Sequence, residues 1–222
     1  MRLALLGIAL PGCIGLTSNK GVDSTTTAIG TDAPPPTEVT LSGLVFGIGP
    51  GDFDVTEPAG AGDLVDQLFT YDVLVYVEEQ LADSLHLDLS LAGADGFQNP
   101  CEPVVELPKA EFDNPTFQSG PADFTARLGG EPVTFHDFLL TGTFDPYAFG
   151  WGDGSLSAQF DAAEVDPALP EGLSACELLA GLGSPCVACA DGGDRCFSLQ
   201  LENITATLVS WPFDPTPDTS GC

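Results

Sequence analysis

The chain has 222 residues, in which 33 Asp and Glu stand against 5 Lys and Arg, giving a formal net charge of −28. A chain this acidic lacks the basic surface that neutralises phosphates, which argues against nucleic-acid binding and against electrostatic adhesion to anionic lipids. Hydrophobic residues make up 43% and charged residues 17%. This balance predicts a folded chain, because disorder requires low hydrophobicity together with high charge.

The first twelve residues have the pattern of an export signal. Arg2 is followed by an apolar run from Leu3 to Leu10 and then by Gly12 and Cys13. A positive start, a short apolar core and a small residue before a cleavage point are typical of secretion. The segment Leu10-Pro11-Gly12-Cys13 resembles the lipobox of bacterial lipoproteins. The resemblance implies a signal peptide over residues 1–12 and a diacylated Cys13 that anchors the chain to the cell envelope, at the outer membrane. The alternative is a buried apolar strand with an incidental cysteine.

Residues 13–37 predict a flexible tether. They include Ser24-Thr25-Thr26-Thr27 and Pro34-Pro35-Pro36 and almost no large apolar side chains. Such a segment cannot bury enough surface to offset its ordering entropy. We therefore expect one folded domain over residues 38–222, which is long enough to build a core.

The cysteine count indicates an oxidising compartment. Six cysteines remain once Cys13 is assigned to lipid: Cys101, Cys176, Cys186, Cys189, Cys196 and Cys222. An even number in an exported chain predicts three structural disulfides. We expect the four between residues 176 and 196 to pair locally, which leaves Cys101 and Cys222 as a long-range pair. Two alternatives are a redox-active Cys186-Val-Ala-Cys189 and a zinc site made of the four clustered cysteines.

Several runs alternate apolar and polar residues with the period of a half-buried strand. Their apolar members are Tyr71, Val73, Val75 and Val77; Leu85, Leu87, Leu89 and Leu91; Phe124, Ala126 and Leu128; and Leu156, Ala158, Phe160 and Ala162. Residues 39–48 are apolar at both parities, which indicates a strand that is central or covered. The sequence thus predicts an all-β antiparallel domain of about eight strands, either a sandwich or a partly closed barrel, with one or two short helices.

Two long runs change parity partway. Val133 and Phe135 share one parity, whereas Phe138 and Leu140 take the other. The run that starts with Phe197, Leu199 and Leu201 continues with Ile204, Ala206 and Leu208. A β-bulge produces this change, because one extra residue re-aims every later side chain. The short helices are expected over residues 63–69 and 170–182, and Gly129-Gly130 is expected to form a hairpin turn.

Candidates for chemistry are few. His86 and Asp88 share one face of their strand and could form a metal site with His136 if its strand were adjacent. The simpler interpretation places these three residues on a solvated face with no chemistry, because an antiparallel sheet commonly leaves one face wet. The sequence shows no nucleophile elbow and no arrangement typical of a catalytic triad. We therefore expect neither catalysis nor a cofactor.

Clustered carboxylates allow a calcium hypothesis. The candidates are Asp52 and Asp54 with Glu57, and Asp191 with Asp194. Calcium prefers several oxygen ligands, but neither cluster fits the Asp-x-Asp-x-Asp-Gly loop, and a solvated acidic surface explains both. Trp151 and Trp211 could line a sugar site, although tryptophans more often lie in a core or at its rim.

Three functions remain open. The chain resembles cysteine-containing lipoproteins of Gram-negative envelopes, most of which have no assigned function, and this implies a non-catalytic binding or interaction role. The second hypothesis is a carrier that holds an apolar ligand inside a barrel, and the third is a calcium-dependent adhesion module. A cavity lined by Phe and Leu would favour the carrier, whereas an exposed aromatic patch would favour a protein partner.

Overall fold

The computed structural model describes residues 40–62, 65, 71–128, 131–169, 172–189, 193 and 195–221. The expected signal peptide, Cys13 and all of the expected tether lie outside the described residues, as do Gly129 and Gly130. The described residues belong to one compact unit, residues 36–222. No helix in this part of the chain is long and apolar enough to cross a membrane.

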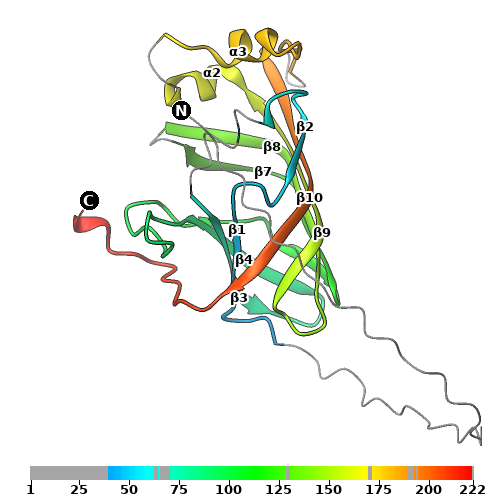
Figure 1. Cartoon of the computed structure of the whole chain (residues 1–222), viewed down its shortest axis with the longest axis vertical. Helices are drawn as coiled ribbons and strands as arrows, with labels where there is room; N and C mark the ends of the chain where they lie inside the picture. Colours follow the sequence, from blue (N-terminus) through cyan, green and yellow to red (C-terminus); the bar gives the residue numbers. More distant parts are fainter. Residues whose placement is uncertain are drawn as a thin grey trace, which may run out of the picture. The chain divides into compact units, whose positions relative to one another are not determined.

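Eight antiparallel strands close into a barrel (Figure 1). In ring order they are β1 (Val45–Ile48), β3 (Val73–Gln80), β4 (Ser84–Leu91), β6 (Ala110–Asp113), β7 (Thr116–Leu128), β8 (Glu131–Phe144), β9 (Gly150–Asp161) and β10 (Cys196–Val209). Pairing of β10 with β1 closes the ring. Two short strands, β2 (Asp54–Glu57) and β5 (Val105–Glu106), add to β10 and β4. The all-β prediction is confirmed, and of its two architectures the barrel is the one observed.

The helical segments lie between β9 and β10. Helix α2 spans Ala162–Val165, a 3-10 helix spans Asp166–Ala168, and α3 spans Ala175–Gly181. The helix expected over residues 170–182 is confirmed, with its start at Ala175. Of the helix expected over residues 63–69, only Val65 is described, and it is helical.

Both predicted bulges are present. The pairing of β8 with β9 shifts register between His136 and Leu139, where Asp137 takes a φ of 50°. The pairing of β10 with β9 shifts between Leu201 and Ile204, where Asn203 takes a φ of 54°. Each shift lets the apolar residues after the bulge continue to face the barrel interior.

The wall formed by β1, β3 and β4 is covered on its outer side. Val45 and Leu74 are buried there in a small second cluster, while Phe46 and Val75 are buried in the main core. Part of the cover is the C-terminal segment, because Phe213 stacks on Tyr76 with ring centroids 4.7 Å apart. This confirms that the first strand is covered on both faces, although it begins at Val45 rather than near residue 39.

Hydrogen bonds fix this cover to the loop that follows β4. The side chain of Gln98 donates to the carbonyl of Asp214 (2.8 Å) and accepts from the Asp214 amide (2.7 Å). The ring of Phe97 packs against Trp211 at 5.1 Å. Trp211 is thus a half-buried residue of the C-terminal segment that packs on this loop.

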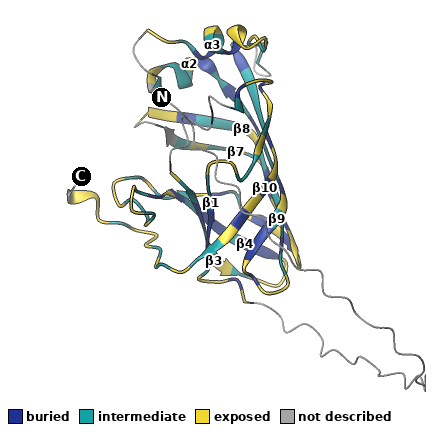
Figure 2. Ribbon diagram, viewed as in Figure 1, coloured by how far each residue is buried: buried dark blue, intermediate teal, exposed yellow. Residues whose placement is uncertain are grey.

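One end of the barrel interior is packed solidly with aromatic rings. Phe117 lies 5.2 Å from Phe144 and 5.3 Å from Trp151, measured between ring centroids, and Phe144 also contacts Phe46 at 5.4 Å. All four side chains are buried. Figure 2 shows β4 mostly buried, whereas β8 begins with exposed residues.

Candidate functional site

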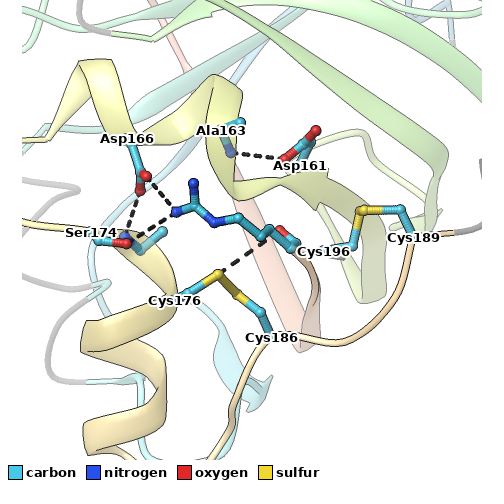
Figure 3. The surroundings of a disulfide bond; sticks show 10 residues. Asp161, Ala163, Asp166, Ser174, Cys176, Cys186, Cys189 and Cys196 are labelled. Carbon is cyan, nitrogen blue, oxygen red and sulfur yellow. Dashed lines mark hydrogen bonds and ion pairs between the residues drawn. A yellow bond between two sulfur atoms is a disulfide. The ribbon is translucent and has the colours of Figure 1, made fainter. Parts of the chain in front are cut away.

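The four clustered cysteines form two disulfides, Cys176–Cys186 and Cys189–Cys196 (Figure 3). The expected local pairing is confirmed. Cys186 and Cys189 belong to different bridges, so the redox and zinc hypotheses for this cluster are wrong. Cys101 is also disulfide-bonded. The expected partner, Cys222, lies outside the described residues.

An ion pair holds α3 against the start of β10. Arg195 donates to Asp166 at 2.6 Å and to the hydroxyl of Ser174 at 3.2 Å, and the amide of Ala175 donates to the other oxygen of Asp166 at 2.7 Å (Figure 3). Burial raises the pKa of Asp166, but these hydrogen bonds and the Arg195 charge outweigh it, so the pKa is lowered. The group is structural, because its donors and acceptors are satisfied by one another.

The histidines of the proposed metal site do not meet. His86 is on β4 and His136 is on β8, and β6 and β7 separate these strands in the ring. His136 instead lies 3.3 Å from Asp123 of β7. The backbone amide of Asp137, and then His136, lower the pKa of Asp123 by hydrogen bonding.

The prediction that Asp88 lies on a solvated face is wrong. Asp88 is only 6% exposed, because the outer face of β3 and β4 is covered. Burial, followed by the charges of Glu78 and Glu106, raises its pKa from 3.8 to about 6, against the opposing effect of His86. Alternation along β4 gave the right face, but the sequence did not show that this face is covered.

The calcium candidates are used locally where the structure describes them. Asp52 accepts a hydrogen bond from the amide of Gly49 at 2.8 Å, and Asp54 accepts one from the side chain of Asn203 at 2.7 Å. Asp191 and Asp194 lie outside the described residues. No group of three or more His, Cys, Asp or Glu side chains suited to a metal ion occurs within the described ranges.

An apolar cavity of about 210 Å³ lies at the other end of the barrel interior. Its lining comes from both halves of the wall: Ile48, Phe53, Val73, Val75, Leu89, Ser90, Leu91, Glu102, Pro103, Val105, Phe124, Ala126, Phe135, Phe138, Leu140, Leu156, Leu199, Leu201 and Ile204. Apart from Ser90 and Glu102, every residue of this set is apolar. The cavity is therefore a hydrophobic hollow with almost no polar lining.

The cavity exists because two strands of the ring diverge. Strand β6 has four residues and pairs with β4 only through Ser84 and Leu85. Strand β7 has 13 residues, but β6 pairs only with its first four, from Thr116 to Ser119. From Gly120 onward the described strands give β7 a partner only on its β8 side. The walls are thus joined at the packed end and separate toward the end where Phe124 and Leu91 lie.

Phenylalanine rings form one wall of the cavity. Phe124 stacks on Phe135 at 4.7 Å and meets Phe138 edge-on at 4.8 Å, and Phe135 also contacts Phe160 at 4.7 Å. Phe138 is fully buried, but Phe124 and Phe135 are only half-buried although they face the interior. Both rings line the hollow, and other side chains leave part of each ring surface uncovered.

Glu102 is the ionisable residue of the lining, and an ordered loop holds it. Its amide donates to the carbonyl of Asn99 at 3.1 Å, and the amide of Asn99 donates to the carbonyl of Leu91 at 2.9 Å. The side chain of Asn99 accepts from the amide of Cys101 at 3.0 Å. These bonds, the disulfide at Cys101 and Pro103 fix the backbone on both sides of Glu102.

A second hollow, lined mainly by residues of β6, β7 and β8, is open and acidic. Its lining includes Asp83, Glu111, Asp113 and Asp153, all of them exposed. Solvated carboxylates on an exposed surface are what a net charge of −28 requires.

The sequence identified several residues of the cavity lining but did not indicate that a cavity exists there. Phe124, Ala126, Phe135 and Leu156 were expected to face inward, but as core residues. Phe53 and Glu102 carried no signal, because both lie outside the alternating runs.

The chain matches no protein-family model, and comparisons with curated proteins and with solved structures find no significant match.

Proposed function

We propose that the barrel binds a small apolar ligand in its cavity, and that the protein acts as a carrier or binding protein. The half-buried phenylalanines around the hollow carry this proposal. Protein interiors are normally filled to the density of organic crystals, and voids much larger than a water molecule are few. A dry apolar cavity of about 150 Å³ is enough to bind benzene. The 210 Å³ observed here suits a ligand somewhat larger than one aromatic ring.

Titration of the full oxidised chain with 1-methylnaphthalene tests the proposal. We expect saturable one-to-one binding in calorimetry. Ala126→Phe fills part of the cavity and should weaken binding by about tenfold or more. Ala163→Phe makes the same enlargement at an exposed position of α2 and should leave binding unchanged. The proposal fails if the probe does not bind, or if both variants bind it equally well.

We further propose that the carrier is an exported lipoprotein of a bacterial envelope, anchored through Cys13 at the outer membrane. The lipobox-like segment supports this, and so do two disulfides, since such bonds persist in oxidising compartments. Expression in a Gram-negative host with labelled palmitate should label the native chain and leave Cys13→Ser unlabelled. Equal labelling of both would contradict the assignment of Cys13, and no labelling of either would contradict the anchor.

A further inference from the structure

We propose that the cavity selects small apolar amines, with the ring or chain of the ligand in the hollow and its ammonium group paired with Glu102. This inference rests on the proposed function and adds the chemical class of the ligand. It follows from three features of the described residues: the charge at the cavity, the apolar character of the remaining lining and the field of the whole chain.

The lining offers a carboxylate and no positive partner. Glu102 is its one ionisable residue, and no Lys, Arg or His is among the lining residues described. An acidic ligand would have to bury its carboxylate without an ion pair, which is costly, and near a second carboxylate, which repels it. An ammonium group would instead form a charge-assisted hydrogen bond with Glu102.

The position of Glu102 suits this role. It is half-buried, so water screens its charge only in part. Its backbone is fixed by the hydrogen bonds around Asn99, which means that ligand binding need not order the loop. Glu102, Leu91 and Pro103 line the same cavity as Phe124, Phe135 and Phe138, so a ligand seated among the phenylalanines shares one hollow with Glu102.

The field of the whole molecule acts in the same direction. A net charge of −28 concentrates cations near the surface and keeps anions away, and this raises association rates for cationic ligands. Fatty acids and other apolar anions are disfavoured both by the field and by the lining. An apolar amine is favoured by both, and it also satisfies the hydrophobic hollow.

Three probes of matched shape separate the effect of the ligand charge from that of its apolar surface: 1-naphthylmethylamine, 1-methylnaphthalene and 1-naphthoate at pH 7. The full chain should bind the amine about tenfold more tightly than the neutral probe, and the acid at least as much more weakly. Glu102→Gln should remove most of the preference for the amine, and continued binding of 1-methylnaphthalene would report that the variant is folded. Glu106→Gln removes the same charge from an exposed position just outside the cavity and should keep the preference.

Some outcomes separate this inference from the proposed function. If 1-methylnaphthalene binds but the amine binds no better, or the acid binds equally well, the amine inference is wrong and the carrier stands. The same holds if Glu102→Gln retains the full preference, because the general field would then be its cause. If none of the three probes binds, the carrier itself is wrong.

Discussion

Phe144 and Phe124 face the same interior from neighbouring strands of the barrel, yet the first is buried and the second half-buried. Phe144 lies where β4, β6, β7 and β8 are joined, and rings surround it. Phe124 lies beyond Ser119, where β7 no longer pairs with β6. The contrast shows that strand pairing, rather than residue type, decides whether an inward-facing aromatic side chain becomes core or cavity wall.

Truncating one ring at each end of the barrel tests most directly whether the two ends are packed differently. Phe144→Ala should lower the free energy of unfolding by about 3–5 kcal/mol, because a large cavity would open in a packed cluster. Phe124→Ala should lower it by about 1–2 kcal/mol, because one side of that ring already faces a hollow. Urea unfolding of both variants measures the difference. Equal losses would mean that the two ends are packed alike.

Enlargement should give the opposite pattern. A methyl group at Gly142 would lie 2.6 Å from Cε1 of Phe117 and 2.7 Å from Cε3 of Trp151, and both of these rings are buried. Gly142→Ala should therefore cost about 1–3 kcal/mol. Ala126→Val adds two methyl groups at the cavity wall and should cost almost nothing. Thermal unfolding compares the two, and a large loss from Ala126→Val would show that the hollow is already filled.

Asp88, on the outer face of the cavity wall, carries a buried charge that lowers the stability of the folded chain at neutral pH. Its pKa is about 6 in the folded chain against an ordinary value of 3.8, so the folded state binds this proton more tightly. Stability should therefore rise as the pH falls from about 6 to about 4, and this contribution is absent above that window. Asp88→Asn should stabilise the protein at pH 7 by about 1–2 kcal/mol, with the gain shrinking toward pH 4.

Urea unfolding at pH 7.5 and pH 4 checks this result. Glu111→Gln, which removes an exposed charge from β6, serves as the matched control and should show no comparable pH dependence. A gain from Asp88→Asn of equal size at both pH values would mean that the burial of its charge is not the cause.

The inward and outward faces of the strands could be predicted because alternation and parity changes are local properties of the sequence. The bulges at Asp137 and Asn203 were located in this way. The covering of Asp88 could not be predicted, because it depends on contacts such as that between Phe213 and Tyr76, which are distant in sequence. Closure of the barrel could not be predicted for the same reason, since pairing of β1 with β10 joins opposite ends of the domain.

The cavity was the hardest feature to predict. Its lining consists of residues that any buried strand would contain, and their number and type give no sign that the hollow exists. What makes it is the shortness of β6 relative to β7, and the sequence of residues 110–113 does not show where their pairing stops. Glu102 lies in a loop, so no periodicity marks its position next to Leu91.

The long connection between β9 and β10 bears on how the domain assembles. Asp161 and Cys196 are paired across the two strands, although the whole helical segment separates them along the chain. Bringing such distant residues together costs loop-closure entropy, which slows non-local strand pairing. Once formed, Cys176–Cys186 and Cys189–Cys196 shorten the free chain that must close. Oxidation before folding should therefore accelerate the joining of β9 to β10, so the order of these two events sets how long the apolar strands stay exposed to aggregation.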